Sequence, residues 1–579
     1  MDQRRFILAI ALMIVIVVAP TFFLKRPVRT PGPVPALDSV APGTAGRDDG
    51  RPAPLPGPDD SAGGVPSFRP SVLPSGAIPA APEDTVLVSS DLYRYGFSTR
   101  GGRLVSAVLP RYTSTVAGRR NELVDLMPPY SRLMELRLVE GRDTLPLDDW
   151  DFTPSAAAVD ARQGGELTLV AERGAVRVEL RYRFEAADYR MHLAGTVTGL
   201  GPNGGLLLVG MGPGLRNTEA DSAMNQRETG LVTEQNGTTL TRLQSLDAGE
   251  VRVLPGPFDW VALKSKYFVQ AVLALDTAAA QVSGVTAVAP ADAGKNPHTA
   301  DIRLAVPLSQ AGTFGWQLYL GPMEYDRLAA VGHDFDDVNP YGWPGFRTLI
   351  RPLAVGARWL LVWMHEHLAL SYGLVLVVFG ILVRVLLWPL NQKAMRSSMA
   401  MQGIQGPMKE LQEKHKENPQ RLQQEMMKLY KEHGVNPLGG CLPMLIPMPV
   451  LFALFFVFQN TIELRGVAFL WIPDLSLKDP VYVIPVVMGA SMFLLSKLGQ
   501  LGMEPTPQTK MMLYFMPAIF TVMFLQFPAG LNLYYAVSNI ASLPQQWLIA
   551  RERKRRMPLP APAAKPAPPA PPPKPGRKR

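Results

Sequence analysis

The chain has 579 residues, of which 47% are hydrophobic and 18% charged, and its formal net charge is +9. The segment from Arg551 to Arg579 holds ten Lys/Arg and one Glu. This excess equals the whole net charge, so the basic character belongs to a tail and does not describe the fold. The single cysteine, Cys441, excludes an intrachain disulfide, and any exported domain must be stable without one.

The N-terminal residues 1–26 are predicted to form an uncleaved membrane anchor. Arg4 and Arg5 precede an uncharged apolar run from Phe6 to Leu24, and no convincing cleavage site follows it. The run is long enough to span a bilayer, and the two arginines favour a cytoplasmic N-terminus. Residues 27–84 are rich in Pro, Gly, Ala, Ser and Asp, which predicts a disordered linker.

Residues 85–335 consist of short runs in which apolar and polar residues alternate. TVLVSS, ELTLVAE and VRVELRYRFEA are examples, and Gly, Asp and Pro separate the runs. This pattern is typical of half-buried strands, and their number predicts a large antiparallel β-sandwich. Residues 336–367 combine aromatic and basic side chains, including Trp359 and Trp363, and favour an amphipathic helix at the membrane interface.

Residues 368–550 contain five apolar segments that predict a membrane-embedded core. The segments are roughly 368–390, 441–461, 481–500, 511–527 and 529–549. With the anchor they give six transmembrane helices, which places both termini in the cytoplasm and the sandwich outside. The 391–440 loop holds eight Lys/Arg and the 463–480 loop holds two, in agreement with the positive-inside rule. The predicted fold class is therefore a multi-span α-helical membrane protein with a large antiparallel β-sandwich domain.

Arg384 lies inside the apolar segment YGLVLVVFGILVRVLLWPL, with no acidic residue beside it. A charge at this depth costs at least a few kcal/mol, so such a residue usually faces a bundle interior or a wet cavity. The alternative is that its guanidinium snorkels to the headgroups near Asn391, roughly 10 Å away along the helix. We favour the functional interpretation.

The later spans are rich in proline and polar residues. Polar groups at membrane depth are tolerated only against protein or water, so these residues either join helices together or line a hydrated groove. The arginine in the same bundle favours the groove. Its predicted lining is Arg384, Gln459, Thr521, Gln526, Asn532, Tyr534, Tyr535 and Ser538.

Residues 391–435 are predicted to form a charged cytoplasmic hairpin of two helices. Asn418 and Pro419 suit the start of its second arm, and Gly434 suits the end. Its apolar side chains either pack the two arms together or offer an adaptable surface to variable apolar partners. The candidate contact residues are Met395, Met399, Met408, Met426, Met427 and Tyr430. The tail 551–579 is cationic and proline-rich, and it fixes topology or binds anionic lipid or ribosomal RNA.

No nucleotide-binding loop, metal cluster or nucleophile–base signature occurs in the sequence. We therefore predict no catalytic residues, no metal site and no enzymatic activity.

Several longer segments resemble those of one known protein family, and they occur in the same order. FSTRGGRLVSAVLP, from Phe97 to Pro110, resembles the start of the family's large periplasmic domain. QQEMMKLYKEHGVNPLGGCLPMLIPMPVLFALF, from Gln423 to Phe455, resembles the junction of the hairpin with the third span. WIPDLSLKDPVYVIPVVMG, FMPAIFTVMFLQFPAGLNLYYAVSN and the membrane arginine follow in family order. By these segments the chain resembles the YidC family of bacterial membrane protein insertases, within the wider Oxa/Alb superfamily.

The resemblance implies a groove open to the cytoplasm and to lipid, with Arg384 in it and Tyr534, Tyr535 and Ser538 near the substrate path. It implies that the hairpin captures substrates and that insertion does not depend on most of the sandwich. Gly380 and Gln526 depart from some relatives, which have a hydroxyl residue and an aromatic there. Apolar substrate segments are expected to slide into lipid along the third and fifth spans, at Leu451, Phe455, Met516, Phe520 and Met523.

The predicted function is insertion and folding of integral membrane proteins in the inner membrane, alone or with the Sec translocon. Burial of the substrate in lipid drives this step, so no cofactor is needed. Expected partners are nascent membrane proteins, the Sec translocon, ribosomes (through the hairpin and tail) and the lipid bilayer. Alternatives are a secondary transporter of an anionic solute, against which the lack of an evident repeat argues, and a membrane chaperone without insertion activity.

Overall fold

A computed structural model describes residues 85–556, apart from short breaks at 130–132, 142, 202–204, 276–280, 293–296, 310, 344, 417, 434–446 and 502–506. The predicted anchor, the linker, Cys441 and the tail beyond residue 556 lie outside the described residues. The chain divides after Ala77, and everything described here belongs to the second unit, from Ile78 onward.

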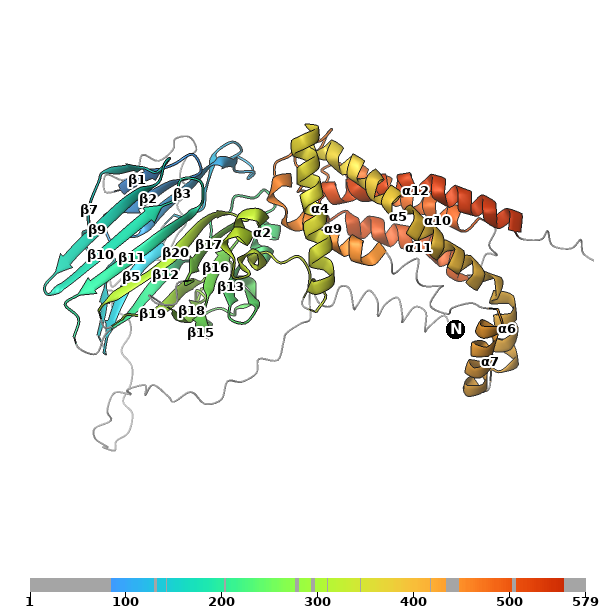
Figure 1. Ribbon diagram of the computed structural model, residues 1–579, viewed down its shortest axis with the longest axis horizontal. Helices are drawn as coiled ribbons and strands as arrows, with labels where there is room; N and C mark the ends of the chain where they lie inside the picture. The colour runs from blue at the N-terminus through green and yellow to red at the C-terminus, as the bar shows by residue number, and fades with distance from the viewer. Residues whose placement is uncertain are drawn as a thin grey trace, which may run out of the picture. The chain divides into compact units, whose positions relative to one another are not determined.

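The first part of this unit contains two β-sheets (Figure 1). The larger has 11 strands in the order β15-β18-β19-β12-β5-β3-β2-β1-β8, with β4 paired to β3 and β6 to β5. In chain order these strands are β1 Thr85–Ser89, β2 Arg94–Ser98, β3 Leu104–Thr113, β4 Leu123–Asp125, β5 Leu133–Glu140, β6 Asp143–Pro146, β8 Ala158–Asp160, β12 Leu206–Gly212, β15 Val251–Phe258, β18 Val282–Val288 and β19 Asp301–Pro307.

The second sheet has 9 strands in the order β14-β13-β16-β17-β20-β11-β10-β9-β7. These are β7 Thr153–Pro154, β9 Gly165–Arg173, β10 Val176–Phe184, β11 Arg190–Thr198, β13 Gly230–Glu234, β14 Thr238–Arg242, β16 Trp260–Lys264, β17 Phe268–Leu273 and β20 Thr313–Pro322. The prediction of a strand-rich domain is confirmed. It is not purely antiparallel, because β1 pairs with β8 in parallel.

The two sheets face each other across one hydrophobic core. Alternate residues of β10 are buried, as a strand with one face toward a core requires. Tyr95 of β2 donates through its hydroxyl to the carbonyl of Leu320 in β20, 2.7 Å away in the other sheet. Phe97 and Tyr182, one from each sheet, pack with ring centroids 4.7 Å apart. Both are fully buried, and each such aromatic side chain contributes about 1.5–3 kcal/mol. The domain is therefore a β-sandwich.

Helices make up the rest of the described chain (Figure 1). Short helices accompany the sandwich: α2 Ser222–Glu228, α3 Tyr325–Val331 and the 3-10 turns η1 Leu243–Ser245 and η2 Phe335–Val338. They are followed by α4 Arg347–Leu368, α5 Tyr372–Gly403, α6 Gln405–Lys414, α7 Pro419–Glu432, α9 Pro447–Asn460, the turn η4 Ile462–Leu464, α10 Val483–Gly499, α11 Pro507–Phe524 and α12 Ala529–Arg556. Helix α12 packs against α5 and α10, α10 against α11, and α4 against α9.

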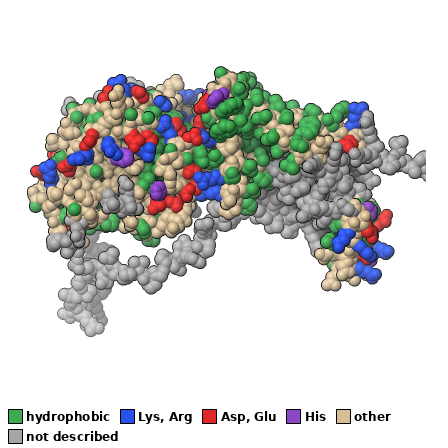
Figure 2. All heavy atoms as spheres, in the orientation of Figure 1, with side chains coloured by type: hydrophobic (Ala, Val, Ile, Leu, Met, Phe, Trp, Pro, Cys, Tyr) green, Lys and Arg blue, Asp and Glu red, His purple; other side chains and the backbone are tan. Residues whose placement is uncertain are grey.

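The helices differ from the sandwich in what they expose. Hydrophobic side chains crowd the visible surface around α4 and the apolar part of α5, whereas Lys, Arg, Asp and Glu are scattered over the sandwich and gather on α6 and α7 (Figure 2). Leu386 of α5 is 74% exposed and Val522 of α11 is 66% exposed. Apolar surface on this scale is typical of a membrane-facing protein.

One described segment, Tyr372–Gln392, is long and apolar enough to cross a membrane. Three apolar helical segments are shorter: Met448–Asn460, Val483–Gly499 and Thr509–Phe524. A full crossing takes about 20 residues, so the predicted count of six spans is not confirmed by the described residues.

The hairpin differs from the prediction in its first arm. Helix α5 runs without interruption from the apolar segment to Gly403, and only the short α6 precedes the turn. The second arm begins as predicted. Pro419 is its first residue, and the Asn418 side chain accepts a hydrogen bond from the backbone N–H of Arg421 at 3.1 Å.

Candidate functional site

Arg384 lies in the middle of the apolar part of α5, where that helix meets α12. A Cβ atom placed on Gly380, one helical turn earlier, would lie 3.2 Å from Val537 Cγ1 and 3.5 Å from Ser538 Oγ. The two helices are therefore in close contact there. The ionisable groups that act on Arg384 are Tyr534 and Tyr535 of α12, and no carboxylate is among them. Within the described part of the chain, Arg384 has no ion pair or hydrogen bond.

Tyr534 and Tyr535 bring three helices together beside this arginine. Their ring centroids lie 5.2 Å apart. Tyr534 packs against Phe379 of α5 and Phe458 of α9, with centroid distances of 5.8 and 6.1 Å. The Tyr535 hydroxyl donates to the Leu451 carbonyl of α9 at 3.3 Å. Helices α5, α9 and α12 thus meet at the two tyrosines beside Arg384.

Buried polar atoms lie along the same helices. Asn532 Oδ1 is buried without a hydrogen-bond partner among the described residues, and the buried hydroxyls of Ser538 and Thr461 have only the phenols of Tyr534 and Tyr341 beside them. Buried polar atoms in proteins are almost always paired with protein or with ordered water. Of the three, Ser538 Oγ lies at the level of Arg384, 3.5 Å from the Cβ position of Gly380, whereas Asn532 lies at the α11–α12 turn and Thr461 beside Tyr341.

Four of the predicted groove residues have other surroundings. Thr521 donates its hydroxyl to the Pro517 carbonyl of its own helix at 2.7 Å. Asn532 donates to the Phe524 and Phe527 carbonyls at 3.0 and 3.3 Å and so closes the α11–α12 turn.

Gln459 and Gln526 lie toward the sandwich. Gln459 donates to Glu228 Oε1 of α2 at 3.1 Å, and Gln526 accepts from Lys478 at 2.8 Å. The structure therefore gathers Arg384, Tyr534, Tyr535 and Ser538 into one site, and places both glutamines at its sandwich-side end.

The predicted sliding surface is an apolar, partly exposed face of α9 and α11. Phe455 packs against Phe456 and Phe527 at centroid distances of 5.4 and 5.6 Å. Met523 is 39% exposed. Leu451, Met516 and Phe520 are half-buried. Side chains of this kind can pack against lipid or against an apolar substrate segment.

The hairpin carries an apolar hollow along α7. Leu422, Met426, Met427 and Tyr430 line it, together with Pro419 and Gln423. The Tyr430 hydroxyl contacts Met408 Sδ at 3.7 Å, which ties α7 to α6. The side chains of Met395 and Met399 lie outside the described part. The two arms thus touch at Met408, while Met427 remains 51% exposed.

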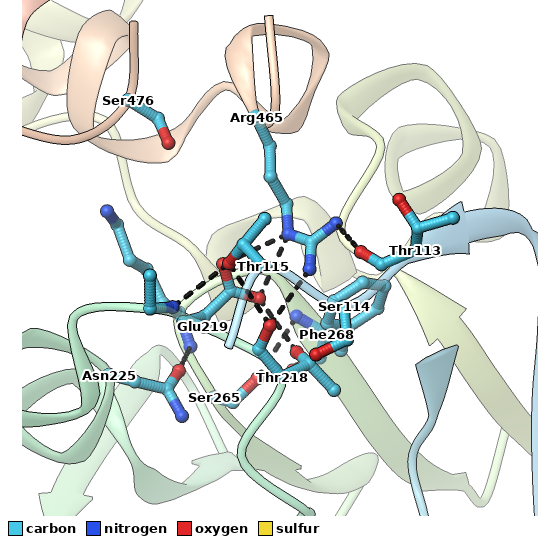
Figure 3. Close-up of polar contacts among 12 residues, drawn as sticks. Thr113, Ser114, Thr115, Thr218, Glu219, Asn225, Ser265, Phe268, Arg465 and Ser476 are labelled. Carbon is cyan, nitrogen blue, oxygen red and sulfur yellow. Dashed lines mark hydrogen bonds and ion pairs between the residues drawn. The ribbon is translucent and has the colours of Figure 1, made fainter. Parts of the chain in front are cut away.

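The loop after α9 is bound to the sandwich by a buried arginine (Figure 3). Arg465 Nε lies 2.9 and 3.0 Å from the two carboxylate oxygens of Glu219. Its Nη1 donates to the Thr113 carbonyl at 2.8 Å and its Nη2 to the Thr218 carbonyl at 3.2 Å. The side chains of Arg465 and Glu219 are each 4% exposed, so this is a fully paired internal cation.

A second arginine, Arg358 of α4, joins the same loop to the sandwich. Its Nη2 lies 3.1 Å from an Asp326 carboxylate oxygen and 2.5 Å from Glu463 Oε1. Burial of Arg358 lowers its pKa, but Glu463 and Tyr341 outweigh this, so the net effect is a raised pKa. The guanidinium therefore stays charged and keeps α4, α3 and the loop together.

The same loop also fixes the first residues of α10 and α12. Asp479 accepts hydrogen bonds from the backbone N–H groups of Val481 and Ile484 at 3.1 and 2.7 Å, and from Trp471 Nε1 at 3.1 Å. The backbone N–H groups of Ala529 and Gly530 donate to the carbonyls of Leu477 and Leu475, at 2.7 and 2.9 Å. The loop is thus a rigid link between the sandwich and two helices of the core.

No local pattern in the sequence marks Arg465, Glu219 or Lys478 as functional. Arg465 and Lys478 were noticed only as the two basic residues of the 463–480 loop, and nothing local marks Glu219. The Asp479-Pro480 pair was the available signal for the loop, since Asp accepts backbone hydrogen bonds at helix starts.

Two family models match this chain. The model described as 60Kd inner membrane protein matches residues 363–556, and the model described as YidC periplasmic domain matches residues 85–355. The membrane protein insertase YidC of Oleidesulfovibrio alaskensis is 30% identical over 95% of this chain and 100% of its own length. That of Syntrophus aciditrophicus is 32% identical over 81% of this chain and 85% of its own.

Solved structures give the same family names at low similarity. A crystal structure of an active YidC insertase aligns with 81% of this chain and 93% of its own, at 18% identity and a TM-score of 0.33. YidC from Thermotoga maritima aligns with 80% of this chain and 99% of its own, at 14% identity and a TM-score of 0.27. The family assignment rests on the sequence matches, and by these the chain belongs to the YidC family of membrane protein insertases, inner-membrane proteins with a periplasmic β-rich domain that insert other proteins and are not enzymes.

Proposed function

We propose that this insertase works through a hydrated groove whose central cation is Arg384. The observation that carries the proposal is the position of this arginine. It lies beside Tyr534 and Tyr535, without a carboxylate partner among the described residues, and a Cβ atom on Gly380, one turn earlier, would lie 3.5 Å from the buried Ser538 hydroxyl. A cation in such a place lowers the cost of moving a polar or acidic segment into the membrane.

In this mechanism the outer tail of a substrate enters the groove from the cytoplasm. Arg384 attracts its carboxylates, and the membrane potential pulls negative charge outward by about 2.3 kcal/mol per charge per 100 mV. The apolar part of the substrate then passes along α9 and α11, over Leu451, Phe455 and Met523, into lipid. Burial of its apolar surface drives the step, so neither a cofactor nor hydrolysis is required.

The topology belongs to the same proposal. It has six spans, both termini in the cytoplasm and the sandwich in the periplasm. The hairpin of α6 and α7 would then lie in the cytoplasm, where the hollow along α7 receives apolar segments of nascent chains. The eight Lys/Arg between residues 391 and 440 support this side. Reporter fusions after residues 26, 415 and 556 would test it, and an extracytoplasmic signal at 415 would reject it.

Ribosomes and the Sec translocon are the proposed partners. The support for ribosome binding is the basic tail, with ten Lys/Arg against one Glu from Arg551 onward, because counterion release favours its binding to phosphate. Removing residues 557–579 should weaken ribosome binding and flatten its salt dependence. A lipid-facing groove can also receive helices from a neighbouring translocon. Cross-linking of a stalled Sec substrate to cysteines at Phe455 or Met523 would test this.

Insertion into sealed liposomes tests the central proposal. A small single-span substrate is added to proteoliposomes, and protection of its outer tail from external protease is measured. One substrate has an acidic tail and a second has the same tail with Asn and Gln in place of the acids. We expect Arg384→Ala to impair the acidic-tailed substrate more than the neutral one. Arg384→Lys should be milder, because charge matters more than guanidinium geometry.

Lys497→Ala is the matched control, since Lys497 is an exposed cation in the last turn of α10. It should insert both substrates as the wild type does. If Arg384→Ala inserts both substrates equally well, the electrostatic role is wrong. If even the wild type protects neither substrate, the chain holds helices without inserting them by itself.

A further inference from the structure

The loop between α9 and α10 has two basic residues, Arg465 and Lys478, and they differ in how they are paired. Arg465 is enclosed by Glu219 and two carbonyls and is 4% exposed, so it is not available to a ligand (Figure 3). Lys478 is 38% exposed. Its nearest carboxylate oxygen, Asp221 Oδ2, is 3.9 Å away, at the limit of an ion pair.

Asp221 is a weak partner because it is already engaged. Its other carboxylate oxygen accepts the backbone N–H of Met224 at 2.9 Å, as the N-cap of α2. By contrast, the three arginines of α4 all have close carboxylate partners in the described structure: Arg347 pairs with Asp337, Arg351 with Asp336 at 2.5 Å, and Arg358 with Glu463 at 2.5 Å. Among the Lys and Arg residues of this loop and of α4, Lys478 is therefore the one that can still bind a second carboxylate.

Lys478 is held in place by its backbone neighbours. The Leu477 carbonyl accepts from the N–H of Ala529, the first residue of α12, at 2.7 Å. Lys478 Nζ itself donates to Gln526 Oε1 at 2.8 Å, in the turn between α11 and α12. The ammonium group is thus fixed at the start of α12 and is not a freely moving surface amine.

This position lies on the outward continuation of the groove. The turn that binds Lys478 also carries Phe524, whose ring contacts Tyr535 at 5.4 Å. Tyr535 is one of the two tyrosines beside Arg384. Along α12, the six residues from Ala529 to Tyr535 rise about 9 Å. Two cations therefore stand in series along α12, Arg384 at the level of the tyrosines and Lys478 at the sandwich-side end.

We propose that Lys478 is a second carboxylate-binding site, which receives the acidic outer tail of a substrate as it leaves Arg384. This rests on the groove proposed above and adds an exit site to it. A substrate carboxylate would take the place of the distant Asp221 and share the ammonium with Gln526. By holding the tail on the periplasmic side, Lys478 slows its return and so favours completion of insertion. Its contribution falls on acidic tails alone.

Lys478→Gln and Lys478→Glu test this in the liposome assay with the acidic and neutral tails. Gln keeps a donor for Gln526, so the turn is preserved. We expect Lys478→Gln to slow the acidic-tailed substrate about two- to fivefold, the effect of losing one partly exposed charge contact. Lys478→Glu should slow it further, and the neutral tail should insert as with wild type. The difference should shrink at high ionic strength, because exposed charges are screened.

Arg162→Gln is the matched control, since Arg162 is an exposed arginine of the sandwich. It removes the same charge and should leave both substrates unchanged. Equal slowing of acidic and neutral tails by Lys478→Gln would show a purely structural role and overturn the proposal. So would the absence of any slowing, or the same slowing by Arg162→Gln.

A proximity measurement gives a second readout. Val481 is 59% exposed and three residues from Lys478, so Val481→Cys in a Cys441→Ser background can report a passing tail. When copper phenanthroline is added as the oxidant, a cysteine in an acidic substrate tail should form a disulfide with it, and Lys478→Gln should reduce the yield. An unchanged yield overturns the proposal. Measuring Arg384→Ala in the same experiment separates the two hypotheses. If Arg384→Ala alone has no effect, the groove model is wrong. If Lys478→Gln alone has no effect, the exit site is wrong.

Discussion

Arg465 and Glu219 form a buried ion pair across 246 residues of sequence, with Nε 2.9 and 3.0 Å from the two carboxylate oxygens. Glu219 belongs to the sandwich and Arg465 to the loop that starts α10. The Thr113 and Thr218 carbonyls complete the guanidinium's contacts. Because both side chains are buried, neither can exchange its partner for water at low cost. The pair therefore holds the loop on the sandwich.

Arg465→Ala should loosen this attachment. Removing one partner of a buried pair leaves an uncompensated carboxylate and typically costs about 3–5 kcal/mol. Spin labels at Arg162 and Val481, in a Cys441→Ser background, would show a broadened distance distribution. Arg465→Lys should be intermediate, since an ammonium keeps the charge but cannot reach all four oxygens. The control is Arg173→Ala, which breaks the exposed pair Arg173–Asp149 and should leave the distance distribution narrow. An equally narrow distribution in Arg465→Ala would contradict this account.

Asp479→Ala should fray the start of α10. Its carboxylate accepts from the N–H groups of Val481 and Ile484 and from Trp471, and leaving such buried donors without a partner costs about 1–3 kcal/mol. Faster hydrogen exchange in the first turn of α10 is the expected signal. Asp479→Asn keeps one acceptor oxygen and should exchange at an intermediate rate. Unchanged protection in Asp479→Ala would show that packing alone fixes this helix.

Gly489→Ala should separate α10 from α11. A Cβ atom there would lie 1.9 Å from Thr521 Oγ1, and overpacking of this kind costs about 1–3 kcal/mol. The double variant with Thr521→Ala should recover part of the loss, a non-additive result expected of residues in contact. Gly356→Ala is the control, because nothing lies within 4 Å of its Cβ position. The stability of Gly489→Ala, of the double variant and of Gly356→Ala is measured by thermal unfolding in detergent. Additive losses of stability in the double variant would contradict a direct contact.

The sandwich should lose stability in alkali between pH 10 and 12. Burial, with a contribution from Glu324, raises the pKa of Tyr189 to about 12, whereas an unfolded tyrosine has a pKa of about 10. The neutral Tyr189 phenol therefore contributes to the free energy of unfolding in full below pH 10, and this contribution is lost as the pH rises through 12. The Tyr189 hydroxyl has no hydrogen-bond partner among the described residues, so Tyr189→Phe should be nearly neutral at pH 7.

Alkaline unfolding of Tyr189→Phe should be correspondingly shallower, as followed by near-UV circular dichroism. Tyr93→Phe is the comparison. Burial also raises the pKa of Tyr93 to about 12, but its hydroxyl donates to the Glu185 carbonyl at 2.9 Å, so this variant should be less stable at pH 7 as well. Identical alkaline curves for wild type and Tyr189→Phe would rule out the contribution of Tyr189.

Predictions from local pattern succeeded where the physical cause is local. Alternating residues in VRVELRYRF predicted β10, because one side of a strand faces a core. Asn418-Pro419 predicted the start of α7, because the cap acts within three residues. The predicted junction of span and hairpin near residue 391 does not end a helix, because no helix stop follows the apolar segment and α5 continues to Gly403.

The sequence by itself determined the strand-rich domain, the apolar helices, the absence of disulfides and the presence of an arginine inside an apolar segment. Only the tertiary structure decided what surrounds that arginine, and that Gln459 and Gln526 point to the sandwich-side end. Only the tertiary structure shows that Arg465 pairs with Glu219 and that Lys478 lies at the limit of an ion pair with Asp221. The reason is physical: periodicity reports which side of an element is buried, whereas partners hundreds of residues apart are chosen by packing and charge after the chain has closed.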